Sequence, residues 1–84
     1  MSTQSDDFLR DLGSLLKEDA LEAKNSASST VGTSDHAFEL GRLTAYYEVV
    51  SLMKQQAISF GISEEAISLS GFDPDSELLA SNGR

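Results

Sequence analysis

The stretch from Asp35 to Phe60, DHAFELGRLTAYYEVVSLMKQQAISF, decides the fold of this chain of 84 residues. It contains no proline and a single glycine, and its apolar residues recur at helical spacing. Ser34 is a natural N-cap for the stretch, and Gly61 can take the left-handed conformation that commonly ends a helix. We therefore predict a helix over about 35–60, roughly 39 Å in length.

The apolar residues of this predicted helix span about 240° of its circumference, which is wider than one packing face requires. One flank carries Leu40, Leu43, Tyr47, Val50, Ala57 and Ile58. The other flank carries Phe38, Ala45, Val49, Leu52, Met53 and Phe60. A helix with two apolar flanks needs a neighbour on each of them.

The remaining segments predict shorter helical elements and a linker. Residues about 5–25 place their apolar side chains in an arc of about 140°, which predicts an amphipathic helix with Thr3 or Ser5 as its N-cap. Residues about 26–34 are small and polar, which predicts a flexible linker. Residues about 63–80 predict two short capped turns that begin at Ser63 and Asp73, and residues 81–84 are expected to fray.

The fold class that follows is all-α. No segment alternates apolar and polar residues as a strand would, and the length fits one domain. We predict a single helical domain over 1–84, in which a long helical hairpin is followed by short C-terminal helical turns.

Self-association is expected because a domain of this size buries only about 60% of its unfolded surface. The first helix can cover one flank of the long helix, and a second copy of the chain would cover the other in a dimeric four-helix bundle. The C-terminal turns or a different protein are the alternatives. The predicted oligomer interface consists of Phe38, Gly41, Ala45, Val49, Leu52 and Met53.

The charge balance and the missing cysteine exclude several classes of protein. Six Lys and Arg against fourteen Asp and Glu give a net charge of −8. Phosphate contacts need clustered positive charge, so we expect no direct nucleic-acid partner. Without cysteine there is no disulfide scaffold and no thiolate metal site. We find no signal-peptide pattern and no apolar run near the ~20 residues of a membrane span, so we expect a cytoplasmic protein without membrane contact.

The side chains that commonly carry catalysis are sparse. His36 is the only histidine. Together with Asp35 and Glu39 it would make a poor zinc site, since zinc takes four ligands, or three and a water. The paired carboxylates lie at helix starts, where they interact favourably with the helix dipole. We expect no enzymatic activity, no cofactor and no bound metal.

The surplus of carboxylates lies outside the long helix and suits a basic protein partner. We expect a non-enzymatic protein that neutralises or chaperones such a partner, of the immunity, antitoxin or adaptor type. The alternative is a structural subunit of a larger homo- or hetero-oligomeric assembly. The candidate partner-binding residues are Glu64, Glu65, Phe72, Asp73, Asp75, Glu77 and Tyr46.

Because no cluster of ligands is present, removal of metals should not affect folding. We expect a chelator to leave the melting temperature unchanged, as measured by circular dichroism or calorimetry. A rise of several degrees on addition of zinc would contradict this interpretation and would point to His36.

Overall fold

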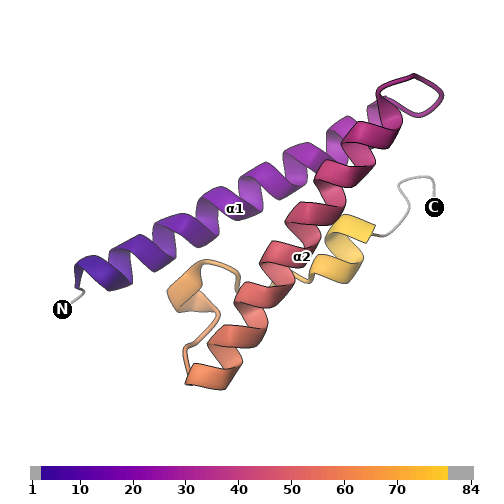
Figure 1. Ribbon diagram of the computed structural model, residues 1–84. Helices are drawn as coiled ribbons and strands as arrows, with labels where there is room; N and C mark the ends of the chain where they lie inside the picture. Colours follow the sequence, from indigo (N-terminus) through magenta and orange to yellow (C-terminus); the bar gives the residue numbers. More distant parts are fainter. Residues whose placement is uncertain (1–2, 80–84) are drawn as a thin grey trace.

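The computed structural model describes residues 3–79. Every secondary-structure element in this range is helical, and the range contains no strand. Two long helices, α1 (Gln4–Ser29) and α2 (His36–Phe60), form an antiparallel hairpin (Figure 1). A 3₁₀ turn, η1 (Glu65–Ile67), and a single π-helical turn, η2 (Asp75–Leu79), follow. The prediction of an all-helical chain with two long packed helices is confirmed.

Helix α1 begins at a capping box. The Thr3 hydroxyl accepts a hydrogen bond from the Asp6 backbone, and the Asp6 carboxylate accepts one from the Thr3 backbone. This reciprocal pair satisfies two backbone donors that have no partner within the helix. Thr3, rather than Ser5, is therefore the N-cap.

The predicted linker over about 26–34 is wrong, because α1 continues to Ser29. Ala27 is buried in the core, so the tertiary contact favours the helix beyond residue 25. The hydroxyls of Ser29 and Thr30 donate to the carbonyl of Ser26, at 3.2 and 2.8 Å. The connection between the two long helices is thus only residues 30–35.

Helix α2 starts and stops close to the predicted positions. Its N-cap is Asp35 rather than Ser34, and the Asp35 side chain makes no capping hydrogen bond. Gly61 has φ 70°, and its N–H donates to the carbonyls of Ala57 and Ile58. A left-handed C-cap of this kind favours glycine, so the predicted stop at Gly61 is confirmed.

Alanines form the contact surface of α1, which we call the alanine seam: Ala20, Ala23 and Ala27, all buried. Side chains this small allow a second helix to approach closely. Helix α2 contributes Leu43, Val50 and Ala57 to the same core cluster, one residue in every seven. Every other residue of α2 is half-buried or exposed.

The large core side chains come mainly from the chain that follows α2. Of the four largest fully buried side chains, only Val50 belongs to a long helix. The other three are Ile67, Leu69 and Leu78. The turn η1 packs on α1, and η2 packs on both long helices. A chain segment of 19 residues thus completes a core that the hairpin cannot form alone.

The Ser63 and Asp73 side chains both accept backbone hydrogen bonds at the C-terminal turns, but the residue directly before η1 is Glu64, whose side chain makes no capping hydrogen bond. The Ser63 hydroxyl accepts from the Ala66 N–H at 3.2 Å, and the Asp73 carboxylate accepts from the Asp75 N–H at 3.2 Å. The predicted end of the second turn at residue 80 and the frayed tail at 81–84 lie outside the described residues.

The shape of the molecule is elongated and thin. Its Cα atoms extend over 49 × 22 × 17 Å, with a radius of gyration of 14.2 Å. A compact domain of 84 residues has a radius of gyration of about 12 Å. The hairpin is therefore a single layer of helices, with the C-terminal turns as its only second layer.

Gly13 is the point at which the C-terminal segment approaches α1 most closely, because a Cβ there would overlap the carbonyl group of Ile67. We expect Gly13→Ala to destabilise the fold by about 1–3 kcal/mol through forced displacement of this backbone. That change corresponds to a loss of roughly 4–8 °C in melting temperature per kcal/mol.

Gly41→Ala is the matched control, since Gly41 is also within a helix but its added Cβ would meet open space. It should leave the melting temperature unchanged or raise it, because alanine is the better helix former by about 1 kcal/mol. Equal effects of the two substitutions on thermal unfolding would show that the contact with Ile67 has no energetic role.

Candidate interaction surfaces

Residues 61–79 cover one side of the hairpin and are held there by lysines of the long helices. The Lys54 ammonium group donates to the carbonyl of Phe72 at 2.5 Å. The Lys24 ammonium group donates to the carbonyl of Leu78 at 3.2 Å. Both lysines are partly buried, so these contacts fix the covering segment at two points along its length.

Several of the predicted partner-binding carboxylates are used inside the chain. Glu64 forms an ion pair with Lys54 at 3.3 Å. Asp75 accepts a hydrogen bond of 2.6 Å from the Tyr47 hydroxyl, and Glu65 accepts one from a nearby serine at 3.3 Å. These groups contribute to the attachment of the C-terminal segment as well as to surface charge.

The C-terminal segment is attached to α1 at two separate points. The segment at η1 is attached near Arg10, whose carbonyl accepts from the Ser68 hydroxyl at 2.8 Å. The turn η2 is attached near Lys24, which lies about 21 Å further along α1. Glu64 and Asp73 nevertheless lie close together, because the Lys54 ammonium group contacts both the Glu64 carboxylate and the carbonyl of Phe72, the residue before Asp73.

Phe72 is not the exposed anchor that the sequence predicted between these carboxylates. It is only 5% exposed and belongs to the core cluster. Its acidic and glycine neighbours suggested a surface position. In the structure a turn runs from Leu69 to Phe72, closed by a hydrogen bond of 3.1 Å from the Phe72 N–H to the Leu69 carbonyl, and the Phe72 ring lies in the core. Tyr46 is half-buried and packs against the same core.

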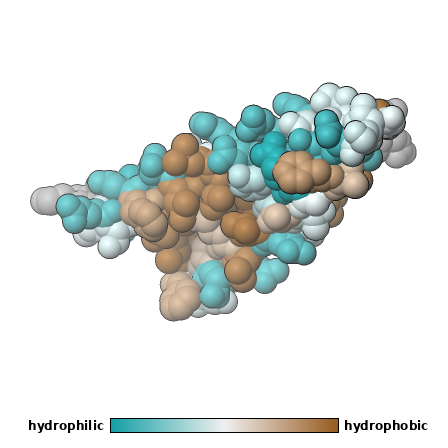
Figure 2. Space-filling view, turned by 45° about the horizontal axis from the view of Figure 1, so that its top comes forward, coloured by the Kyte–Doolittle hydropathy of each residue, from teal (hydrophilic) through white to brown (hydrophobic). Residues whose placement is uncertain are grey.

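The opposite side of the hairpin carries a group of large exposed side chains that we call the apolar face. Phe38 and Phe60 are 70% and 75% exposed, and Val49 and Leu52 are 46% and 59% exposed. Helical spacing places these four on the side of α2 away from Leu43 and Val50. The apolar face also includes Phe8 and Leu15 of α1. Figure 2 shows hydrophobic surface gathered over both long helices.

The residues predicted as an oligomer interface follow this face on α2. Gly41 and Ala45 are exposed beside Phe38, and Met53 is half-buried at the margin with the core. The described C-terminal residues cover the side of α2 that carries Tyr47 and Lys54 instead. In residues 3–79, the predicted interface thus has no covering segment.

A row of carboxylates on α1 forms a second surface, which we call the acidic ridge. Its members are Asp7, Asp11, Glu18 and Glu22, all exposed. Their spacing of four, seven and four residues aligns them on the side of the helix opposite the alanine seam. Sequence reasoning did not single out this row, although its spacing is visible once the buried face of α1 is known.

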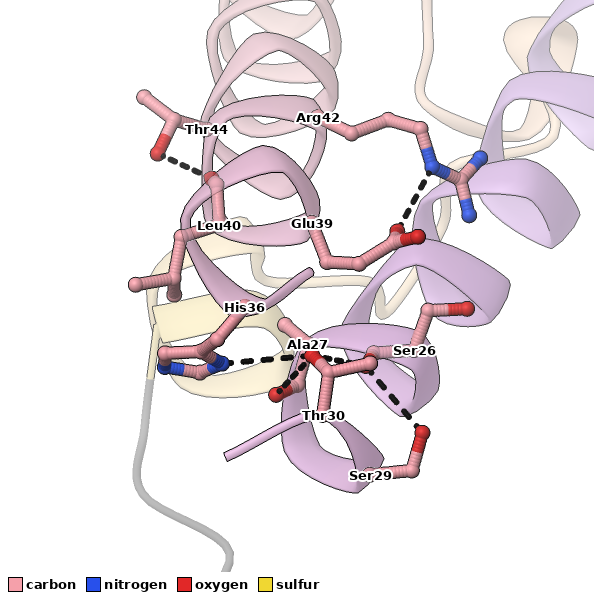
Figure 3. A network of polar contacts seen from close by, with 9 residues as sticks. All are labelled: Ser26, Ala27, Ser29, Thr30, His36, Glu39, Leu40, Arg42 and Thr44. Carbon is pink, nitrogen blue, oxygen red and sulfur yellow. Dashed lines mark hydrogen bonds and ion pairs between the residues drawn. The ribbon is translucent and has the colours of Figure 1, made fainter. Parts of the chain in front are cut away.

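The hairpin end of the molecule contains His36 and a small polar network, shown in Figure 3. The Nδ1 atom of His36 lies 3.3 Å from the Thr30 hydroxyl. Arg42 forms an ion pair of 3.2 Å with Glu39, and the hydrogen bond to Glu39 raises the pKa of Arg42 above its ordinary value. Within residues 3–79, no three His, Asp or Glu side chains gather as a metal site would require.

An open groove runs along the first turns of α1. Its lining includes Ser14 and Ser68 together with Asp7 and Asp11. It contains no histidine or lysine, so neither serine has there the basic partner that activates a hydroxyl nucleophile. Among residues 3–79, neither long helix has the combination of length and hydropathy that crossing a bilayer requires.

Comparisons with known protein families, with curated proteins and with solved structures find no match to this chain.

The hydrogen bond between Tyr47 and Asp75 affects the ionisation of the Tyr47 phenol. The hydrogen bond to Asp75, partial burial and the nearby negative charge raise the pKa of Tyr47 above its ordinary value of 10.0. Since folding favours the protonated phenol, this contribution to stability is complete below about pH 10 and is lost as the pH rises past the raised pKa.

We expect a late tyrosinate step in an alkaline titration followed by near-ultraviolet absorbance. Tyr47→Phe should remove this late step, whereas Tyr46→Phe should retain it. The opposite assignment would mean that the Tyr47 hydroxyl is not bonded to Asp75 in solution.

Proposed function

We propose that this chain is a non-enzymatic interaction protein that binds a basic protein partner through the acidic ridge of α1. The observation that carries this proposal is the alignment of Asp7, Asp11, Glu18 and Glu22 on one exposed helix face. All four lie on one continuous helix, so their positions relative to one another do not depend on a mobile loop.

The acidic ridge has the properties of a recognition surface for positive charge. Asp7 is paired with Arg10 at 3.1 Å, but both side chains are more than half exposed, and an exposed pair contributes only about 0–1 kcal/mol. A partner with clustered Lys and Arg could replace such a weak pair. The chain's net charge of −8 would also attract that partner over a distance and raise the rate of association.

Such a protein would neutralise or chaperone its partner, as immunity proteins, antitoxins and adaptors do. The absence of enzymatic activity is part of the proposal. It is supported by the scattered positions of the polar residues, because His36 lies at the loop end of the hairpin while the open groove lies at the other end of α1.

A structural subunit of a larger assembly is the second candidate, and the apolar face favours it. Phe38, Val49, Leu52 and Phe60 are all exposed on one side of α2. A helical layer is stable when its apolar side is buried against another layer. The two roles use different surfaces, so one chain can perform both.

Affinity capture from an extract of the source cells tests the first candidate. Asp7→Asn, Asp11→Asn, Glu18→Gln and Glu22→Gln, combined, remove four charges from the acidic ridge. We expect this variant to retain about tenfold less of any basic partner than the unmodified protein does, because the steering charges are lost. Raising the salt to about 0.5 M should have the same effect on the unmodified protein.

The matched control removes four charges from the C-terminal turns: Glu64→Gln, Glu65→Gln, Asp73→Asn and Glu77→Gln. It has the same net charge but leaves the acidic ridge and the Tyr47–Asp75 contact intact, so it should retain the partner. Loss of binding in this control alone would move the partner surface to the C-terminal turns. Capture that is indifferent to both variants and to salt would contradict the proposal.

A further inference from the structure

The apolar face is large enough to form an interface between two chains. Its four large side chains on α2 expose about 450 Å² of apolar surface, on the basis of roughly 200 Å² for a whole Phe side chain. Phe8 and Leu15 of α1, which are 64% and 49% exposed, raise this area to about 650 Å². A standard protein interface buries about 800 Å² on each partner, and the largest apolar patch on an ordinary monomer covers about 300–600 Å².

The pattern of residues on this face is symmetric along α2. Val49 lies midway between Phe38 and Phe60. Ala45 and Met53 lie four residues to either side of it, and Tyr46 and Leu52 lie three residues to either side. A two-fold axis that passes beside Val49 therefore places an apolar residue of one copy opposite an apolar residue of the other at each of these positions.

We infer that the partner of the apolar face is a second copy of the chain, with the two α2 helices antiparallel across a two-fold axis at Val49. This inference rests on the second candidate function, the structural subunit, and specifies its partner. Phe38 then packs on Phe60 of the partner subunit at each end of a contact about 33 Å long. The small Ala45 faces the long and flexible Met53 of the partner subunit, so side-chain volumes are complementary.

Leu15 favours the antiparallel arrangement over a parallel one. Leu15 and Val49 each lie about 14 residues from the loop end of their helix, so they are at nearly the same level of the hairpin. If the two-fold axis runs across the hairpin at this level, the second copy covers Leu15 as well as Val49. A parallel pair of α2 helices would leave Leu15 and Phe8 exposed and would also align the two helix dipoles unfavourably.

The lack of charge on the α2 part of this face favours an apolar occupant over a charged one. Between Phe38 and Phe60 the face carries Ala45 and Gln56 but no charged residue, and Arg42 at its edge is paired with Glu39. A basic protein is not attracted electrostatically to an uncharged surface, whereas the acidic ridge does attract it. An anionic lipid surface would repel a chain of net charge −8.

Sedimentation equilibrium at micromolar concentration tests the association itself. We expect the unmodified chain to be dimeric and Leu52→Glu to be monomeric, because a carboxylate buried without a partner is costly. Leu52 is exposed in the single chain, so the variant should retain its helical circular dichroism. A monomeric unmodified chain, or a dimeric Leu52→Glu, would overturn the inference.

Disulfide cross-linking tests the register, since the chain has no cysteine of its own. Val49→Cys should form a disulfide-linked dimer at least about tenfold faster than the control Gln55→Cys, because the two thiols at the axis have a millimolar effective concentration. Gln55 is exposed on the same helix but away from the apolar face.

A mixture of Arg42→Cys and Gln56→Cys chains distinguishes the two orientations. These positions lie seven residues to either side of Val49, so we expect the mixed dimer to cross-link and each variant alone to cross-link poorly. Cross-links within each variant alone would indicate a parallel pair and would overturn the register while leaving self-association intact. Cross-linking of Val49→Cys with Leu15→Cys chains instead of with itself would indicate that α2 packs on α1 of the partner, with the same consequence.

Discussion

The close approach of α2 to the alanine seam is the contact on which the rest of the structure depends. Ala20, Ala23 and Ala27 bring the helices together at the loop end of the hairpin. Toward its N-terminus α1 presents Leu9 and Leu16 instead, and the two helices diverge (Figure 1). The divergence creates room for the C-terminal segment, whose Ile67 backbone lies directly against Gly13. Because the alanines hold the helices together only at the loop end, large side chains of the C-terminal segment fill the space between the helices where they diverge.

The number of residues that follow α2 determines what remains exposed. Nineteen described residues cover part of one side of the hairpin, where Leu40 and Ile58 remain 44% and 73% exposed. They are held to that side by Lys24, Lys54 and Tyr47. The other side keeps its Phe, Val and Leu residues in contact with water. On α1 the apolar face adjoins the acidic ridge, since Phe8 lines the same groove as Asp7 and Asp11. Both surfaces lie on helices whose rotation is fixed by the core.

Local signals in the sequence predicted the features that depend on neighbouring residues. The cap at Thr3, the stop at Gly61 and the hydrogen bonds accepted by Ser63 and Asp73 are all formed within one or two turns of the chain. The two errors involve contacts between distant segments. Helix α1 continues past residue 25 because Ala27 is buried in the core, and Phe72 is buried because residues 61–79 fold back on the hairpin. The acidic ridge was missed for a related reason, since its exposed position is defined only by the buried face opposite to it.

The position of the large core residues near the C-terminal end has a consequence for synthesis on the ribosome. The Ser68 hydroxyl reaches the carbonyl of Arg10 across 58 residues of sequence, and Leu69 and Leu78 have no counterpart of similar size within α1's buried surface. The hairpin therefore leaves the ribosome before its core is complete, and it gains the large core side chains only when residues 61–79 have followed. Contacts so distant in sequence form slowly because the intervening chain must first be ordered. Until residues 61–79 fold back, the hairpin exposes apolar residues on both of its sides, and exposed surface of this kind promotes association with other chains.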